Sequence, residues 1–162
     1  MKKDKLLFGI IRLGMGWVFL WSFLDKMFGW GFATPADQAW IAGGSPTTGF
    51  LTYGTKGPFA DIFQSLAGNP IVDWLFMLGL LGIGVALILG IGVKVAGYAG
   101  VLMFALMYLA GFIPPEHNPF FDEHVLNALI LLMLVYVDAG MYLGLGKKWQ
   151  KQTLVKKYPW LA

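Results

Sequence analysis

The sequence predicts an all-α fold: an integral membrane four-helix bundle with both termini in the cytoplasm and short helices in a long outer loop. Three observations lead to this prediction. Of the 162 residues, 57% are hydrophobic and only 13% are charged, whereas a soluble domain carries about 25% charged residues. Four apolar runs have the length of a bilayer span, about 20 residues. The basic residues gather at the ends of these runs, where they orient a multi-pass protein in the cell membrane.

The four predicted spans cover about residues 6–28, 71–93, 95–113 and 124–144, within a single membrane domain of residues 1–162. The first run also has the position of a secretory signal peptide. Its apolar stretch is longer than the usual one of about 7–15 residues, and it contains Arg12. The aromatic Phe28-Gly29-Trp30 that follows is typical of a membrane interface rather than of a cleavage site. We therefore expect the first run to be retained as a helix.

Lysine positions predict the orientation of the spans. Lysines precede the first span, mark the short link between the second and third, and follow the fourth: Lys2, Lys3, Lys5, Lys94, Lys147, Lys148, Lys151, Lys156 and Lys157. The two longer connections, about residues 29–70 and 114–123, contain a single basic residue, Lys56. Because basic loops stay in the cytoplasm, we expect both termini there and both longer loops on the outer side.

The outer loop, residues 29–70, is divided by Pro35, Pro46, Pro58 and Pro70. The pieces 36–42 and 58–66 each predict a turn or two of helix, the second with apolar residues at helical spacing. A structureless loop of this length is unusual. A lid packed on the bundle and a solvated connector with aromatic anchors both fit this pattern.

The second and third spans are rich in glycine. Ala96 with Gly100, and Gly140 with Gly144, have the small-xxx-small spacing that lets two helix backbones approach closely in lipid. Packing within one bundle is the favoured interpretation, and a face for forming a homo-oligomer is the alternative.

Arg12 and Asp138 are charges inside predicted spans, where an ionised group is costly without a partner. Both lie about six to eight residues from the cytoplasmic ends of antiparallel helices, so a rise of about 1.5 Å per residue puts them at similar depth. We predict a structural ion pair between them. A pair that fixes helix register is favoured over a proton relay.

A polar face in the fourth span locates the candidate site. Its members are spaced by three or four residues and so lie on one side of a helix: His124, Asn127, Leu131, Leu134 and Asp138. The first span offers a matching line with an adjoining stripe: Arg12, Gly16, Phe19, Phe23 and Lys26, beside Trp17, Trp21 and Asp25. The loop before the fourth span adds Glu116, His117, Asp122 and Glu123. Together they predict a polar pocket near the outer surface, walled by Trp17, Trp21 and Tyr108.

Aromatic walls with a histidine and a carboxylate suit a quinone, whose ring stacks and whose carbonyl oxygens accept hydrogen bonds. We expect His124 to exchange protons, because histidine titrates near neutral pH, with Asp25 as its catalytic partner. The predicted quinone-binding residues are Trp17, Trp21, Lys26, Tyr108 and Asn127. The alternative is a rim of polar residues that meets water. This rim is favoured for Glu116 and His117 and stays equally open for His124 and Asn127.

Composition excludes several other classes of site. The chain has no cysteine, which removes thiolate catalysis, iron–sulfur ligation and thiolate zinc sites. Its two histidines lie at the same predicted membrane edge and no HExxH spacing occurs, so no metal or haem is predicted. The basic residues lie at the chain ends and beside apolar runs instead of forming a phosphate-binding face. The expected partner is therefore the lipid bilayer and not a nucleic acid.

An arginine early in the first span, followed by glycine and an Asp-Lys pair near the outer end, resembles the opening of DoxX/DoxD-type proteins: Arg12-Leu-Gly-Met-Gly16 and Leu24-Asp25-Lys26. The stretch His117-Asn-Pro-Phe-Phe-Asp-Glu-His124-Val-Leu-Asn127, the glycine-rich middle hairpin and the aspartate near the inner end of the fourth span are also similar to that family. The long outer loop is closer to the DoxD branch.

The resemblance implies a four-helix membrane bundle. For the DoxD branch it implies a subunit of thiosulfate:quinone oxidoreductase, an enzyme of sulfur metabolism that also needs a separate DoxA-like subunit. This chain would then be the membrane subunit of a quinone-linked oxidoreductase. The alternative is a non-catalytic membrane scaffold or assembly factor of the same family. A small transporter is disfavoured, because no proline falls within the four predicted spans to break a helix at mid-bilayer.

Overall fold

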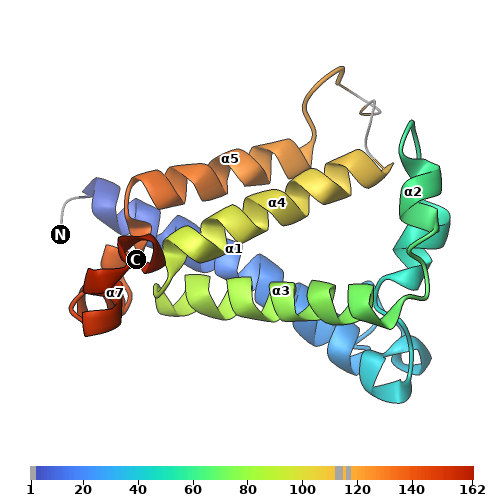
Figure 1. Cartoon of the computed structure of the whole chain (residues 1–162), viewed down its shortest axis with the longest axis horizontal. Helices are drawn as coiled ribbons and strands as arrows, with labels where there is room; N and C mark the ends of the chain where they lie inside the picture. The colour runs from blue at the N-terminus through green and yellow to red at the C-terminus, as the bar shows by residue number, and fades with distance from the viewer. Residues whose placement is uncertain (1–2, 112–114, 116–117) are drawn as a thin grey trace.

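The computed structural model describes residues 3–111, 115 and 118–162, and within them every regular element is a helix. In the described residues the bundle contains the helices α1 (Lys3–Phe28), α3 (Pro70–Leu89), α4 (Val93–Gly111) and the shorter α5 (Glu123–Tyr136) (Figure 1). In this described part of the chain, three helices, α1, α3 and α4, are long and apolar enough to cross a membrane. The all-α prediction is confirmed.

Helix α5 is shorter than the predicted fourth span. It has 14 residues and ends at Tyr136, which at about 1.5 Å per residue gives about 21 Å, against about 30 Å for the core of a bilayer. Beyond it the backbone of Asp138 is left-handed, with φ 48°, and a 3-10 turn, η4 (Ala139–Met141), follows. The predicted helix over 124–144 is wrong beyond Tyr136, because Asp138 and Leu143 both have positive φ and interrupt it.

Local sequence explains where α3 begins and ends. The Asn69 side chain accepts a hydrogen bond from the backbone N–H of Ile71 (2.9 Å), and Pro70 stands in the first turn, where a missing N–H is tolerated. At the other end Gly90 has φ 71°, the left-handed conformation that glycine adopts without strain. Helix α4 starts at Val93, so α3 and α4 form a tight hairpin.

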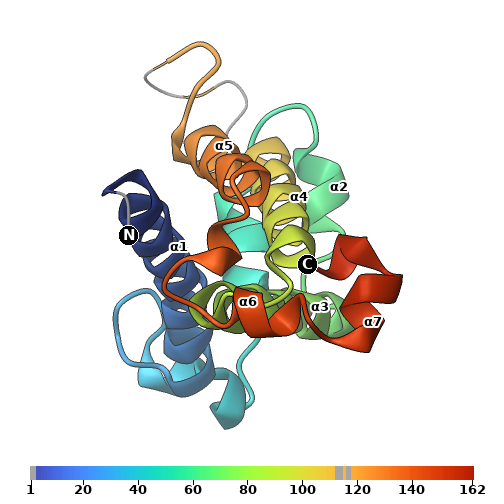
Figure 2. The same cartoon turned by 90° about the vertical axis from the view of Figure 1, so that its left-hand side faces the viewer.

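In the bundle, α1 packs along α3, α3 along α4 and α4 along α5, while α1 meets the end of α5 chiefly at η4 (Figure 1 and Figure 2). One end of the bundle, here called the terminal end, carries the start of α1, the α3–α4 link and the C-terminal segment. That segment comprises α6 (Gly146–Trp149), α7 (Thr153–Lys157) and η5 (Pro159–Leu161). The opposite end, here called the loop end, carries the segment 29–69 and the start of α5.

Glycines bring the helix backbones together. A methyl group at Gly84 would lie 2.8 Å from the backbone nitrogen of Leu20, so α1 and α3 are in close contact at that point. A methyl group at Gly97 would collide with Val135 of α5. The predicted packing of glycine within one bundle is confirmed at these positions.

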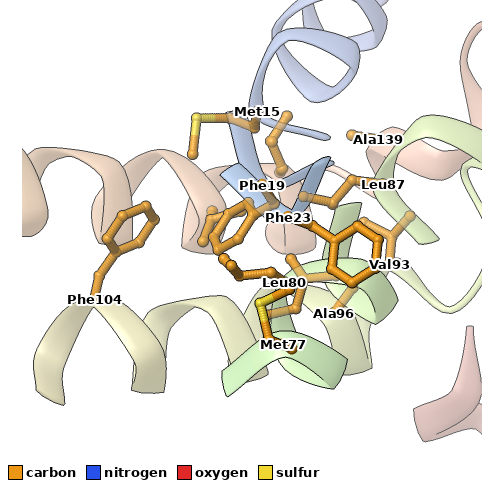
Figure 3. Close-up of a cluster of buried hydrophobic side chains, with 13 residues drawn as sticks. Met15, Phe19, Phe23, Met77, Leu80, Leu87, Val93, Ala96, Phe104 and Ala139 are labelled. Atoms are coloured by element: carbon orange, nitrogen blue, oxygen red, sulfur yellow. The ribbon is translucent and has the colours of Figure 1, made fainter. Parts of the chain in front are cut away.

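A cluster of buried apolar side chains fills the space between the helices, with Phe19, Met77, Leu80 and Leu87 among its members (Figure 3). The outward faces are apolar as well. Leu75 of α3 is 67% exposed, Leu102 of α4 60% and Leu126 of α5 54%. Large apolar side chains on the outside of successive helices are typical of a surface that lipid surrounds.

The segment 29–69 contains four short helical pieces: η1 (Ala36–Gln38), η2 (Trp40–Ala42), a π-helical turn η3 (Phe50–Gly54) and α2 (Ala60–Gln64). The predicted turns at 36–42 and 58–66 are confirmed, and η3 was not predicted. Hydrogen bonds fix the segment to the bundle: the hydroxyls of Ser45 and Thr47 donate to Asp73 of α3 at 2.9 and 2.5 Å. It is a packed lid over the loop end rather than a free connector.

Candidate functional site

Arg12 lies at the terminal end and is completely buried. Its Nη1 donates to the carbonyl oxygens of Leu87 and Ile88, the second at 3.1 Å, and its Nη2 donates to those of Tyr142 (3.0 Å) and Leu143 (2.9 Å). The first two carbonyls belong to the last turn of α3, where they have no partner within the helix. The guanidinium charge also faces the negative end of that helix dipole.

These four hydrogen bonds correct the predicted ion pair between Arg12 and Asp138. Because α5 ends at Tyr136, the Asp138 side chain is turned outward and is 53% exposed, with Lys94 Nζ at 3.9 Å from its carboxylate. Arg12 meets backbone carbonyls instead of a carboxylate. It joins α1 to the end of α3 and to the turn after η4, so its part at the terminal end is structural.

Glycines leave the room that the guanidinium needs. A methyl group at Gly144 would lie 2.9 Å from Nη2 of Arg12, and one at Gly90 would lie 3.1 Å from Nη1. The arginine and the surrounding glycines form a tightly packed clamp between α1, the end of α3 and the turn after η4.

Asp25, near the loop end of α1, is 2% exposed. Its carboxylate accepts hydrogen bonds from the backbone N–H groups of Phe32 (3.1 Å) and Ala33 (2.9 Å) and also interacts with Thr34. These bonds hold the chain where it turns back after α1, at Gly29 with φ 66°. The predicted catalytic partner of the histidine therefore holds the loop that follows α1.

Lys26, a predicted quinone-binding residue, is directed toward α3. Its Nζ lies 6.0 Å from the centre of the Phe76 ring, a cation–π contact at the usual limit of about 6 Å. This contact places Lys26 on the side of α1 that packs on α3 and not on the side nearer α5.

Trp17 and Trp21 belong to a ladder of aromatic rings on the outward face of α1, which we call the aromatic ladder. Its ring centres lie 5.5 Å apart for Trp17–Trp21, 5.3 Å for Trp21–Trp30 and 4.9 Å for Trp21–Phe32. Trp17 is 52% exposed, whereas Phe19 is 3% exposed. Residues two apart on a helix point to nearly opposite sides, so both tryptophans face away from the core. They do not wall the predicted pocket.

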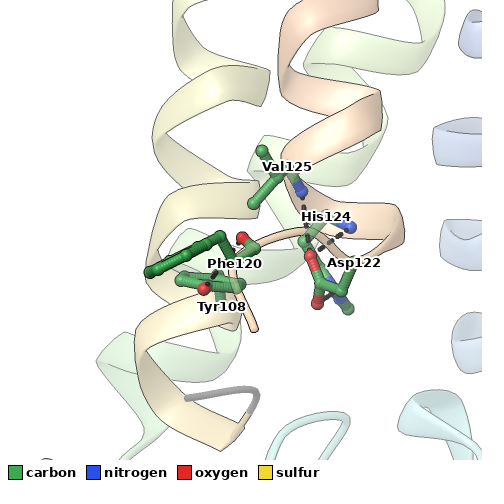
Figure 4. Close-up of polar contacts among 5 residues, drawn as sticks. All are labelled: Tyr108, Phe120, Asp122, His124 and Val125. Carbon is green, nitrogen blue, oxygen red and sulfur yellow. Dashed lines mark hydrogen bonds and ion pairs between the residues drawn. The ribbon is translucent and has the colours of Figure 1, made fainter. Parts of the chain in front are cut away.

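The start of α5 holds a buried carboxylate–imidazole pair (Figure 4). Nδ1 of His124 lies 2.8 Å from Oδ2 of Asp122, and the same carboxylate accepts the backbone N–H groups of His124 and Val125, both at 3.0 Å. Asp122 is therefore both the N-cap of α5 and the group that orients the imidazole. The side chain of His124 is 7% exposed and that of Asp122 11%.

Two aromatic residues of α4 lie beside this pair. The Phe104 ring centre is 6.0 Å from the imidazole of His124 and 5.2 Å from the ring of Phe19 on α1. One turn further along α4, the Tyr108 hydroxyl donates to the carbonyl oxygen of Phe120 (3.2 Å) in the chain that leads into α5 (Figure 4). Of the predicted site, the structure therefore brings Tyr108 and His124 to the same region.

The predicted polar face of the fourth span is confirmed over its first half. His124, Leu131 and Leu134 are buried and Asn127 is half-buried, whereas Asp138 leaves the face when the helix ends. Glu116 and His117 lie outside the described residues.

The sequence prediction places Asp122 in the loop before the fourth span and does not identify it as the N-cap that contacts His124. An aspartate immediately before an apolar helical run is a typical N-cap signal, and a histidine two residues later is within reach of the same carboxylate. The spacing Asp122-x-His124 was therefore the available clue.

The pair can hold and transfer a proton. Imidazole can accept and donate a proton, and a carboxylate on Nδ1 fixes the orientation of the ring. Within residues 3–111, 115 and 118–162, no group of three histidine or carboxylate side chains is placed to hold a metal ion. The chemistry this geometry supports is proton exchange next to aromatic rings.

Comparison with known proteins identifies no relative. No protein-family model matches the sequence, and no curated protein and no solved structure matches it significantly. The resemblance to DoxX/DoxD-type proteins stays a prediction from the residues that carry it.

Proposed function

We propose that this chain crosses the cell membrane four times, with both termini in the cytoplasm. The apolar outward faces of α1, α3 and α4 support placement in lipid. Helix α5 and the η4 turn after it return the chain to the terminal end, which supports a fourth crossing. Most of the lysines belong to the terminal end, and basic segments stay in the cytoplasm.

Within this topology, the chain acts as the membrane subunit of a quinone-linked oxidoreductase that resembles the DoxD subunit of thiosulfate:quinone oxidoreductase. The observation that carries the proposal is the buried pair of His124 and Asp122, with 2.8 Å between Nδ1 and Oδ2, beside the ring of Phe104. Reduction of a quinone takes up protons together with electrons. A buried imidazole held by a carboxylate is suited to supply the protons.

The electrons need a second subunit. This chain has no cysteine, so it has no thiolate on which a sulfur substrate could be held. A DoxA-like partner would oxidise thiosulfate, and the electrons released there would pass to the quinone. His124 supplies protons, while Phe104 and Tyr108 contribute aromatic surface for the ring.

The test uses the purified protein in phospholipid nanodiscs, alone and with its partner subunit. Titration with a short-chain quinone should quench tryptophan fluorescence to saturation. His124→Ala should lower thiosulfate-dependent quinone reduction by about 100-fold, the usual effect of removing a proton-transfer group. Leu126→Ala, on the exposed side of the same helix, is the matched control and should keep the wild-type rate.

Asp122→Asn separates the two roles of the cap. Asparagine caps a helix as well as aspartate does, so the melting temperature should stay within about 2 °C, equivalent to about 0.5–1 kcal/mol in a chain of this size. The rate should nevertheless fall, by less than in His124→Ala, because the imidazole stays in place but loses the carboxylate charge beside it. A protein that binds no quinone, or a His124→Ala variant with the wild-type rate, would refute the proposal.

A non-catalytic scaffold is the second candidate, and the aromatic ladder favours it. Phe32 is 74% exposed, Trp30 49% and Trp17 52%, a concentration of aromatic surface that a partner protein could cover. Under this reading Trp30→Ala with Phe32→Ala abolishes co-purification of the partner, while His124→Ala leaves the function of the assembly intact.

A further inference from the structure

An apolar groove of about 440 Å³ runs between α3 and α4 on the side away from α1 and α5. Its walls include Leu78 and Ile83 of α3 and Val95 of α4. Leu78 is 55% exposed and Val95 42%, so the groove opens onto the surface that lipid surrounds. None of its residues takes part in the proton-transfer site described above.

The C-terminal segment closes the groove at the terminal end. Trp149 of α6 and Leu161 of η5 both line it, and the indole N–H of Trp149 donates to the carbonyl oxygen of Leu161 at 2.6 Å. The backbone N–H of Lys94 donates to the carbonyl oxygen of Ala162 at 2.9 Å, which fixes the segment to the start of α4. The groove is therefore lined by apolar side chains along α3 and α4, and the segment 146–162 closes one of its ends.

That closing segment is strongly basic. The described residues 139–162 contain five lysines, all exposed, and no aspartate or glutamate: Lys147, Lys148, Lys151, Lys156 and Lys157. The nearest carboxylate in sequence, Asp138, lies 3.9 Å from Lys94. The segment that closes the groove thus carries five exposed positive charges and no acidic side chain.

We propose that this groove and the basic segment form a binding site for one anionic phospholipid of the cytoplasmic leaflet. An acyl chain lies in the groove between α3 and α4, and the phosphate lies against the lysines of α6 and α7. Basic pockets at the cytoplasmic side of membrane helices are known to hold anionic headgroups, and each lysine near the surface contributes about five-fold in affinity. The lipid site rests on the membrane topology proposed above and is independent of the quinone chemistry.

The experiment compares phosphatidylglycerol with phosphatidylcholine of identical acyl chains, added to the purified full chain in detergent. Native mass spectrometry counts the lipids retained and gives an apparent Kd for each. We expect one retained phosphatidylglycerol, bound at least tenfold more tightly than phosphatidylcholine. Equal affinity for both lipids would overturn the proposal.

Two variants with matched controls test the two halves of the site. Lys147→Gln with Lys148→Gln should weaken the binding of phosphatidylglycerol by about 25-fold, at about five-fold per lysine. The control is Lys3→Gln with Lys5→Gln, at the same end of the bundle but on α1, which should change the affinity by less than about threefold. An equal loss of phosphatidylglycerol affinity in the two double variants would mean that the anionic lipid is attracted by the overall positive charge, and it would overturn the proposed site.

Gly82→Leu tests the groove. A methyl group at Gly82 meets nothing within 4 Å, and the same holds for Gly14 of α1, so both positions accept a side chain without disturbing the fold. Gly82→Leu should fill the groove and lower phosphatidylglycerol affinity by at least tenfold, and Gly14→Leu should leave it unchanged. If Gly82→Leu instead leaves lipid binding intact and splits a dimer into monomers, the groove holds a second copy of the chain and the lipid site is wrong.

Discussion

At the terminal end of the bundle a buried charged side chain binds backbone, and at the loop end a buried charged side chain binds another side chain. Arg12 donates to four carbonyl oxygens from two segments of the chain. Asp122 accepts two backbone N–H groups but also meets the imidazole of His124 at 2.8 Å. Both residues complete helix ends, yet only the second arrangement includes an imidazole, a side chain that can accept and donate a proton.

The difference follows from what each end must satisfy. The last carbonyls of α3 are inside the protein, and an unpaired carbonyl away from water is costly, so a permanently charged donor with several N–H groups serves them. At the start of α5 an aspartate already caps the helix and has a second oxygen available. Placing a histidine two residues later converts a cap into a carboxylate–imidazole pair. The terminal end is thus a structural clamp, and the loop end is where proton chemistry is expected.

Removing the clamp should have the largest effect. Arg12→Ala leaves the carbonyls of Leu87, Ile88, Tyr142 and Leu143 without their donor in a buried place. At about 1.5–3 kcal/mol for a hydrogen bond to a charged group, with incomplete additivity, we expect a loss of about 3–5 kcal/mol. That corresponds to about 8–15 °C in apparent melting temperature for a chain of this size, measured by thermal unfolding in detergent.

Arg12→Lys is the control, because lysine keeps the charge but cannot reach four acceptors with one nitrogen. Its melting temperature should lie between those of the wild type and Arg12→Ala. A drop of less than about 2 °C for Arg12→Ala, or about 0.5–1 kcal/mol, would mean that water reaches the carbonyls and that the two ends do not differ in this way.

The contact between α1 and α3 keeps the two ends in register, and Gly84 tests it. A methyl group there would lie 2.8 Å from the backbone nitrogen of Leu20, and a backbone cannot swing aside as a side chain can. Gly84→Ala should therefore cost about 1–3 kcal/mol, as overpacking does. Gly82→Ala, two residues away with nothing within 4 Å, should be neutral or stabilising by up to about 1 kcal/mol, because alanine favours helix. Equal melting temperatures for both variants would contradict the close contact.

The sequence predicted the parts of this fold that depend on apolar length and on helix spacing. The long apolar runs became α1, α3 and α4, and His124, Leu131 and Leu134 lie on the buried side of α5 as expected. The helical spacing also predicts the orientation of Trp17. A residue two positions from the core residue Phe19 points away from the core, which is incompatible with a pocket wall.

The partners of Arg12 and Asp25 and the end of α5 depend on backbone groups and backbone conformation, which the pattern of side chains does not show. Helix spacing predicts an ion pair between Arg12 and Asp138, but the acceptors of Arg12 are main-chain carbonyls, which every residue has. The residue type of Asp25 predicts a functional carboxylate, whereas its partners in the structure are the backbone N–H groups of Phe32 and Ala33. The end of α5 was missed because Val137 to Gly144 continues the apolar pattern, while the left-handed conformations at Asp138 and Leu143 depend on tertiary contacts rather than on local propensity.

Asp25 lies at the loop end but binds backbone groups, as Arg12 does at the terminal end, so its role should be structural. Asp25→Ala removes the acceptor for Phe32 and Ala33, whose own side chains are exposed, so water can replace part of what is lost. We expect about 1–2 kcal/mol of destabilisation and faster hydrogen exchange confined to residues 29–36, measured by mass spectrometry. Quinone reduction per folded molecule should be unchanged. If turnover falls while hydrogen exchange stays normal, Asp25 takes part in catalysis, and the two ends do not differ in the way described.

The smallest effect is expected for Asp138→Asn, at the residue predicted to pair with Arg12. Its partner Lys94 lies at 3.9 Å, and the two side chains are 53% and 35% exposed, so the ion pair contributes at most a few tenths of a kcal/mol. The backbone of Asp138 has φ 48°, a conformation that asparagine tolerates and alanine does not. Asp138→Asn should therefore leave stability within about 0.5 kcal/mol, while Asp138→Ala costs about 1–2 kcal/mol, both from thermal unfolding. If the two variants are equally destabilised, the charge and not the backbone conformation matters, and the terminal end depends on a second charged contact besides Arg12.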